Sequence, residues 1–299
     1  MSTAINAENL DRRECVQQDD LLIGPLLAPR NSARTAGKGS IHDDATAQKL
    51  GFRGGTVAGS LHMEQFPPLL THTFGDRWWQ TGGMSLYFRY ATTDQEAVRC
   101  FGKLDPALIE ATKGQTNIWI EDNEEHLIAE GTASIGGADI HSALRMRIAD
   151  VPRATDLRIL KDLVVGDSSS PRPVRIASDS LAGRLAVITE PLEVYEGAKP
   201  YLPPSMMVQA MRAGEADVLV RHKDIGVGLF GAIEVQNING PVYAEHDYTC
   251  ITTVLAVSET PKTEYVWYES LLTDAESDAK VASMLMMLRF MKASSALWQ

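Results

Sequence analysis

The stretch GKGSIHDDATAQKLGFRGGTVAGSLH, residues 37–62, combines a polar loop, a short helical run and the start of an apolar helix. His42 stands in the loop beside two acidic residues, Asp43 and Asp44. We expect Asp44 to be the N-cap of the helical run, because a carboxylate at that position accepts hydrogen bonds from unpaired N–H groups of the first turn. The glycine pair at 54–55 is typical of a turn, which separates the run from the apolar helix.

Two apolar helices are expected, one in each half of the chain. The first starts near Gly59 and runs to residue 74, with an interruption at the proline pair 67–68. The second covers 205–220 and follows the proline pair 203–204, where proline is tolerated at a helix start. Both are apolar nearly all round, as a helix enclosed by a sheet must be.

Segments rich in β-branched and aromatic residues follow each helix in the same order, which predicts strands. In the second half the same landmarks recur about 150 positions later, for example Cys100 and Cys250. This internal repeat predicts two domains, 1–150 and 151–299, joined near residues 150–156. The expected strands are 84–91, 97–104, 115–122 and 126–135, then 229–237, 248–257, 263–272 and 279–290.

A helix followed by an antiparallel meander is the order of the hotdog fold, so the predicted fold class is α+β: two tandem hotdog folds, each an antiparallel sheet wrapped around a central helix. Residues 37–62 also resemble the hydratase motif of the MaoC-like family, which includes the R-specific enoyl-CoA hydratases. That motif reads Asp-x-Asn-Pro-x-His-x-Asp, then a short helix, then Phe/Gly-x-x-x-Val-x-His-Gly-Met-Leu. Residues 41–44 match x-His-x-Asp, Phe52 and Val57 fall in register, and 59–61 replace Gly-Met-Leu. The second half resembles the degenerate partner domain of that family.

The resemblance implies a lyase, a hydratase or dehydratase acting on an acyl thioester or a related unsaturated carbonyl compound. In that family an Asp and a His hold the reacting water, and the glycine N–H at the helix start holds the thioester oxygen. Hydration beside a carbonyl needs a base for water, an acid for the α-carbon and a donor for the enolate oxygen. His42 and Gly59 match these roles.

The motif is degenerate at three places. The family Asp position is Gly37, the Asn-Pro pair is replaced at 39–40, and the His before the glycine is Ala58. Because glycine cannot transfer protons, Asp43 is a candidate replacement for the missing carboxylate.

Two other functions stay open at this point. A repurposed hotdog enzyme, such as a cyclase, isomerase or thioesterase, would use Asp43 or Glu64 as its base. A non-catalytic binding protein would have lost the chemistry in both halves. Arg34 and Lys38 are either contacts for an anionic ligand such as a CoA phosphate or surface charges. The expected substrate-binding residues are Val57, Ser60, His62, Glu64, Arg34 and Lys38.

Composition excludes some partners. The net charge of -11 argues against a nucleic acid and against an anionic membrane surface. The three cysteines lack a Cys-x-x-Cys pair, so neither a disulfide framework nor a metal site is expected, and Cys100 and Cys250 are interpreted as buried apolar residues. Without a signal-like or membrane-length apolar run, we expect a cytoplasmic location. The expected partner is a small molecule carried as a CoA or carrier-protein thioester. No cofactor is expected, and a homodimer is left open.

Overall fold

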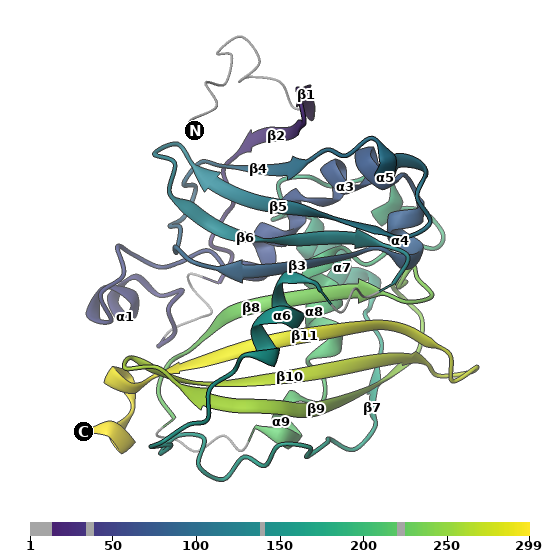
Figure 1. The fold of residues 1–299 in the computed structure, drawn as a ribbon. Coiled ribbons are helices and arrows are strands. Elements are labelled where there is room, and N and C mark those ends of the chain that lie inside the picture. The colour runs from purple at the N-terminus through teal and green to yellow at the C-terminus, as the bar shows by residue number, and fades with distance from the viewer. Residues whose placement is uncertain (1–13, 34–38, 138–140, 220–224) are drawn as a thin grey trace.

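The computed structural model describes residues 14–33, 39–137, 141–219 and 225–299. Within these ranges, eleven strands form one antiparallel sheet in the order β1-β2-β4-β5-β6-β3-β8-β11-β10-β9-β7 (Figure 1). Strands from the first half of the chain fill one half of this sheet, and strands from the second half fill the other. The two halves meet where β3 pairs with β8, for example at Leu86 and Ile233.

The eight predicted strands are all present, with ends shifted by a few residues. Three short or irregular strands were missed, β1, β2 and β7. β2 and β7 each contain a proline, which weakens the strand signal, and pairing with a neighbouring strand stabilises them. The strands are β1 Val16–Gln18, β2 Leu21–Leu27, β3 Gly83–Phe88, β4 Val98–Lys103, β5 Gly114–Asp122, β6 Leu127–Ile135, β7 Arg172–Val174, β8 Gly228–Asn237, β9 Tyr248–Glu259, β10 Thr263–Asp274 and β11 Lys280–Met291.

Each half has a central helical segment, and both segments are broken. The first consists of α2 Gly59–His62, the 3-10 turn η2 Met63–Gln65 and α3 Pro67–Phe74. The proline pair lies in the first turn of α3, so the predicted interruption is confirmed. The second consists of α8 Pro204–Met211 and α9 Glu215–Val218, where the sequence predicted one continuous helix.

The remaining helices are short and lie mostly around these elements (Figure 1). They are α1 Asp44–Lys49, α4 Arg77–Thr81, α5 Ala107–Glu110, α6 Ala143–Ala149, α7 Ser178–Leu185, η3 Glu193–Tyr195, η4 Lys292–Ser294 and η5 Ala296–Trp298. None of the helices within the described ranges has the length and apolarity needed to cross a bilayer.

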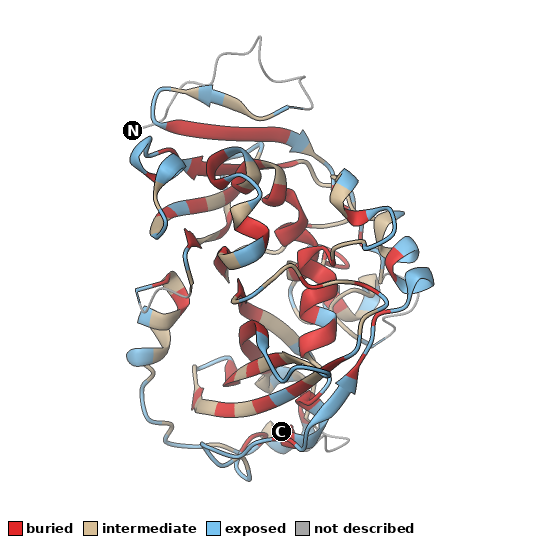
Figure 2. Cartoon of the chain, turned by 90° about the vertical axis from the view of Figure 1, so that its right-hand side faces the viewer, coloured by how far each residue is buried: buried red, intermediate tan, exposed pale blue. Residues whose placement is uncertain are grey.

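The main core lies between the sheet and the central helices, where buried residues gather in Figure 2. It includes Phe66 and Leu70 from the first half and Met206 and Met211 from the second, all almost completely buried. α2 also contacts α8, so the helical segments of the two halves meet inside the molecule. Burial of apolar area on this scale is the main stabilising contribution to the fold.

The opposite face of the sheet is covered at the junction of the halves by α6, seen in front of β3 and β8 in Figure 1. Leu144 of α6 belongs to a second apolar cluster with Trp267, Leu285 and Met287. The chain therefore passes over the outer face of the sheet between its halves. The domain division at 150/151 stays a prediction.

Cys100 and Cys250 are buried in β4 and β9, as predicted, and both are free thiols.

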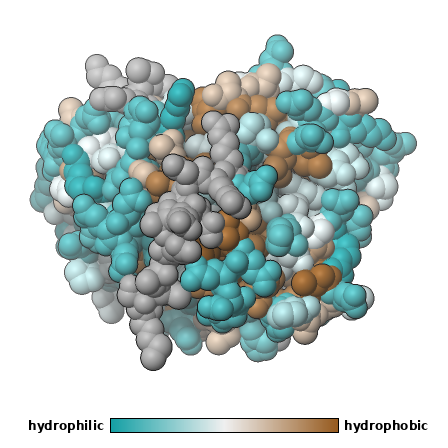
Figure 3. Space-filling model, turned by 90° about the horizontal axis from the view of Figure 1, so that it is seen from above, coloured by the Kyte–Doolittle hydropathy of each residue, from teal (hydrophilic) through white to brown (hydrophobic). Residues whose placement is uncertain are grey.

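On the face shown in Figure 3, hydrophobic residues lie in several patches among hydrophilic ones. The exposed large apolar residues include Leu26, Met146, Val164 and Val165. A homodimer remains a prediction.

Candidate active site

A cavity of about 790 Å³ is lined by both halves of the molecule. The first half contributes the loop before α1, the start of α2 and the end of β3. The second half contributes the segment after α8, the end of β11 and the turn 260–263. Much of the lining is apolar, with side chains including Phe52, Phe88, Phe230, Leu288 and Phe290.

His42 lines this cavity and is half-buried. Its Nδ1 lies 2.7 Å from the carbonyl oxygen of Thr56. Because a carbonyl oxygen only accepts hydrogen bonds, Nδ1 carries a proton, and in the neutral ring Nε2 keeps its lone pair. Asn31 donates its amide to the His42 carbonyl at 2.8 Å, which anchors the backbone of the loop.

Gly59, the first residue of α2, lines the same cavity. Its N-cap is Ala58, whose side chain makes no capping hydrogen bond. The first N–H groups of a helix lack partners within the helix and lie at its positive end. Val57, also predicted as a site residue, lines the cavity and is held by a 2.9 Å hydrogen bond from its N–H to the Thr92 carbonyl.

The predicted roles of the two aspartates need correction. Asp43, not Asp44, is the N-cap of α1: its carboxylate accepts the Thr46 N–H at 3.1 Å and the Thr46 hydroxyl at 2.6 Å. The backbone is still extended at Asp43, which makes it the boundary residue. The hydroxyl hydrogen bond from Thr46 lowers the pKa of Asp43. Asp44 instead accepts the Gly55 N–H at 2.8 Å. Asp43 is not among the cavity-lining residues, so the geometry gives no support to its predicted role as a replacement for the missing family carboxylate.

His62 lies on α2 and lines the cavity, although its side chain is almost fully buried. Gln65 donates to its Nδ1 at 3.2 Å, so its Nε2 donates to the Thr92 hydroxyl at 2.8 Å. Burial lowers the pKa of His62 to about 4, which keeps the ring neutral near pH 7. His62 is therefore a neutral part of the wall.

Two other predicted substrate contacts lie away from the cavity lining. Ser60 is buried, and Glu64 is completely buried. One Glu64 oxygen accepts the Ser205 N–H at 2.6 Å, across the boundary between the halves. Because the Glu64 carboxyl group contacts α8 and lies outside the cavity lining, the geometry gives no support to the prediction that Glu64 contacts substrate. Arg34, Gly37 and Lys38 fall outside the described residues.

Replacing Glu64 with glutamine is expected to change the pH dependence of stability. Burial raises the pKa of Glu64 from 4.5 to about 7. A raised carboxyl pKa gives a stabilising contribution that is complete below the unfolded pKa and is lost as the pH rises through the folded pKa. The free energy of unfolding of the parent protein, relative to Glu64→Gln, should therefore fall by on the order of 3 kcal/mol between about pH 4.5 and about pH 8. Urea unfolding of both proteins measures this; a difference that stays constant with pH would contradict the assignment.

The sequence did not predict Arg212 and Glu215 as site residues, yet both line the cavity. Arg212 donates two hydrogen bonds to Glu215, at 2.6 and 2.7 Å, and the Tyr268 hydroxyl donates a third at 2.6 Å. The buried Glu215 carboxyl group is thus paired with a guanidinium and a hydroxyl. The signal was present as a charged pair three positions apart inside a mostly apolar segment, but no family motif covers it.

The charge of the cavity is opposite to that of the whole protein. Four cationic side chains line it, Arg89, Arg212, Lys262 and Arg289, against the single carboxylate of Glu215 among the described residues. A cluster of one sign in a concave site attracts ligands of the other sign. No group of three or more His, Cys, Asp or Glu residues in the described ranges is placed to hold a metal ion.

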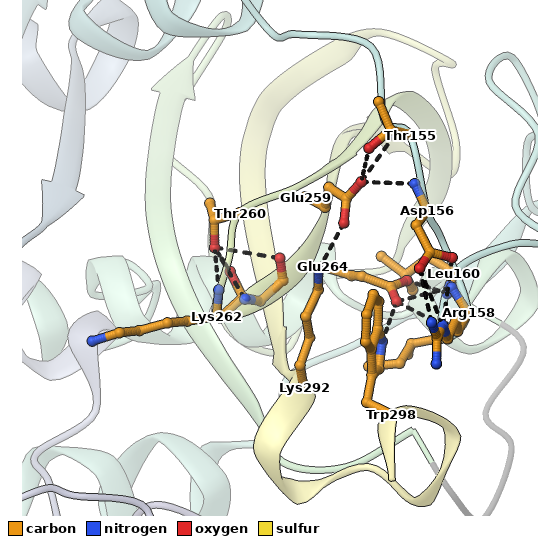
Figure 4. A network of polar contacts seen from close by, with 12 residues as sticks. Thr155, Asp156, Arg158, Leu160, Glu259, Thr260, Lys262, Glu264, Lys292 and Trp298 are labelled. Carbon is orange, nitrogen blue, oxygen red and sulfur yellow. Dashed lines mark hydrogen bonds and ion pairs between the residues drawn. The ribbon is translucent and has the colours of Figure 1, made fainter.

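The turn 260–263 on the cavity wall is supported by two carboxylates at the ends of β9 and β10 (Figure 4). Glu259 accepts hydrogen bonds from Thr155 and Asp156 and pairs with Lys292, and these contacts lower its pKa to about 2. The Glu264 carboxyl group accepts hydrogen bonds from the backbone N–H groups of Arg158 and Leu160, which follow Asp156 in the linker, and from the indole N–H of Trp298 near the C-terminus. Lys262 extends away from this network.

Comparison with solved structures identifies the architecture. A Mycobacterium tuberculosis protein, Rv0216, described as having a double hotdog fold, matches with a TM-score of 0.56 and 10% identity over 95% of this chain and 97% of that one. This chain has a double hotdog fold. The predicted fold class is thus confirmed.

Other matching solved structures carry the name of the family that residues 37–62 resemble. A Chloroflexus aurantiacus protein assigned as a MaoC domain dehydratase matches with a TM-score of 0.60 and 12% identity over 89% of this chain and 94% of that one. A MaoC-like dehydratase matches with a TM-score of 0.50 and 12% identity, over 95% and 100%. No protein-family model and no curated protein matches the chain. The likeness at these identities is one of fold.

Proposed function

We propose that this double hotdog protein is a hydratase or dehydratase that acts on an α,β-unsaturated acyl thioester. The observation that carries the proposal is that His42 and Gly59, the first residue of α2, line one cavity. Both residues occupy the positions that the MaoC-like motif assigns to catalysis. The Gly59 N–H is oriented at the positive end of a helix, where it can stabilise a developing enolate oxygen.

The proposed reaction uses His42 as both base and acid. Its Nε2 takes a proton from water as the water oxygen bonds to the β-carbon, and the electron pair of the double bond moves to give the enolate. The imidazolium then returns a proton to the α-carbon, so one water adds across the double bond. The hydrogen bond from Nδ1 to the Thr56 carbonyl oxygen orients the ring throughout.

The lining supports a ligand with an apolar and an anionic part. Aromatic and aliphatic side chains suit an acyl chain, and Lys262 and Arg289 suit the phosphates of a CoA or a carrier-protein arm. The test is turnover: the purified protein is incubated with enoyl-CoA esters of several chain lengths and with the matching carrier-protein thioesters. Loss of the enoyl absorbance with formation of the hydroxyacyl product is the expected result. Inactivity on every thioester in the panel would contradict the proposal and leave a non-catalytic protein as the alternative.

Gly59→Ala is expected to reduce turnover by about 100-fold, because a displacement of about 1 Å at a reacting centre has an effect of that size. A Cβ at this position would lie 2.7 Å from the ring of Phe88, so the helix start or the ring must move. Ser60→Ala is the matched control, since Ser60 does not line the cavity, and it should retain turnover within about twofold. Steady-state kinetics with circular dichroism of both variants would check this. Equal activity of Gly59→Ala and the control would remove Gly59 from the mechanism.

The proposed function of a repurposed enzyme that uses Asp43 or Glu64 finds less support. The Asp43 carboxylate caps α1, and the Glu64 carboxyl group contacts α8. Neither residue lines the cavity. A base must come within hydrogen-bond reach of the proton it removes, so these two groups are poorly positioned for that role.

A further inference from the structure

Thr92, in the segment that follows β3, lines the cavity and is only 1% exposed. Its hydroxyl oxygen lies 2.8 Å from Nε2 of His62 and accepts the hydrogen on that nitrogen. A hydroxyl group can donate one hydrogen and accept at two lone pairs. The contact with His62 uses one lone pair, and within the described ranges no residue accepts the hydrogen of this hydroxyl. The cavity wall therefore contains a buried donor that is still available.

The direction of this donor is fixed by the two residues behind it. Burial lowers the pKa of His62 to about 4, so the ring is neutral and carries one hydrogen. Gln65 donates to Nδ1 at 3.2 Å, which leaves the ring hydrogen on Nε2, facing Thr92. The hydrogen of the Thr92 hydroxyl must then point away from His62. A buried donor without an acceptor is unfavourable, and an oxygen of a ligand in the cavity would satisfy it.

One peptide group joins Thr92 to the proposed acid–base residue. The carbonyl oxygen of Thr56 lies 2.7 Å from Nδ1 of His42, and the N–H of Val57, in the same peptide group, donates to the Thr92 carbonyl at 2.9 Å. The oxygen and the hydrogen of a trans peptide group point in opposite directions. His42 and Thr92 therefore flank this peptide group from opposite sides.

A second contact ties Thr92 to α2. His62, which holds the Thr92 hydroxyl, is three positions after Gly59, and residues three apart lie on the same face of a helix. A helical side chain also leans toward the start of its helix. Thr92 is thus held against the first turn of α2, where the Gly59 N–H is proposed to bind the thioester oxygen, while His42 lies across the peptide group on the side of the reacting water.

We propose that the Thr92 hydroxyl donates a hydrogen bond to the carbonyl oxygen of the thioester, as a second donor beside the Gly59 N–H; this inference rests on the proposed hydratase function. The carbonyl oxygen gains negative charge as the enolate forms, so a donor fixed in the wall stabilises the transition state more than the bound substrate. The hydrogen stays on Thr92 throughout the reaction. His62 and Gln65 are positioning residues, because they act on the substrate only through this hydroxyl.

Thr92→Val removes the hydroxyl and is expected to lower kcat on an enoyl thioester by about 100-fold, as loss of one oxyanion donor does. Thr92→Ser keeps the hydroxyl and should recover most of the lost turnover. The matched control is Thr93→Val: the Thr93 hydroxyl donates to Glu96 and does not line the cavity, so kcat should stay within about twofold of the parent value. Parental kcat in Thr92→Val, or equal losses in folded Thr92→Val and Thr92→Ser, would overturn the proposal.

A double-mutant cycle tests the positioning role of His62. His62→Leu should lower kcat in the parent background but change it by less than about twofold in the Thr92→Val background, because the two residues act as one unit. Equal fold losses in both backgrounds would show that His62 acts by another route. Circular dichroism checks that each variant is folded, and the two Thr92 variants decide the main claim if His62→Leu does not fold.

Infrared difference spectroscopy detects the contact without turnover. The ligands are saturated analogues of the panel thioesters, labelled with ¹³C at the carbonyl carbon. A hydrogen bond to the carbonyl oxygen lowers its stretching frequency, so the frequency should be lower in the parent and Thr92→Ser than in Thr92→Val. Equal frequencies in a parent that hydrates thioesters would refute only the Thr92 contact. The expected shift in a parent that hydrates none would refute only the hydratase function, and failure to bind any analogue would refute both.

Discussion

His42→Ala is expected to lower the turnover of an enoyl thioester by about 10³-fold, within the range that general acid–base catalysis contributes. The substitution removes the group proposed to transfer protons at the cavity and leaves the amide of Gly59 in place. Residual activity should come from binding and from the oxyanion contact alone. The measurement is kcat on the best substrate found in the thioester panel. Hydration of the enoyl thioester and dehydration of the hydroxyacyl thioester are both assayed.

The matched control for this experiment is His72→Ala. His72 is an exposed histidine on α3 and does not line the cavity, so its removal tests the loss of an imidazole elsewhere. It should leave kcat within about twofold of the parent value. If His42→Ala turned over substrate at the parental rate, the hydratase proposal would fail, while the double hotdog fold would be unaffected.

Glu264→Ala is expected to lower the free energy of unfolding by about 4 kcal/mol. Glu264 has no exposed surface. Its carboxylate accepts backbone N–H groups at 2.9 Å from Arg158, 3.1 Å from Ile159 and 2.8 Å from Leu160, and the Trp298 indole N–H at 2.6 Å. Alanine would leave these donors without an acceptor, and each buried donor left unpaired costs about 1–3 kcal/mol before the segment relaxes.

Urea unfolding at constant pH measures this effect, and Glu276→Ala serves as the control because Glu276 is exposed near the end of β10. Glu264→Gln, which keeps one acceptor oxygen, should fall between the parent and Glu264→Ala. Since residues 260–263 line the cavity, Glu264→Ala should also weaken substrate binding, seen as a higher KM. A loss below about 1 kcal/mol would show that the linker and the C-terminal segment are held by other contacts.

The residues of the site divide according to how far apart their partners lie in the sequence. His42 and Gly59 are 17 positions apart in one motif, and the resemblance of that motif to the MaoC-like one was sufficient to expect them together. Arg212 and Glu215 join the same cavity from the other half, and no local pattern places them there. Whether Asp43 or Asp44 caps α1 depends on the backbone conformation of a single residue. Helix boundaries cannot be predicted from sequence to within one residue.

Local patterns in the sequence determined the repeat, the eight main strands, the interruption of the first central helix and the burial of Cys100 and Cys250. These features follow from residue preferences and apolar periodicity, which act over a few neighbouring positions. Only the tertiary structure decided where Glu64 points, because its hydrogen-bond partner Ser205 is 141 positions away. The same holds for the short strands at the sheet edges and for the cationic lining of the cavity. Each of these depends on packing between distant segments, and the energy of such contacts exists only once the chain has folded.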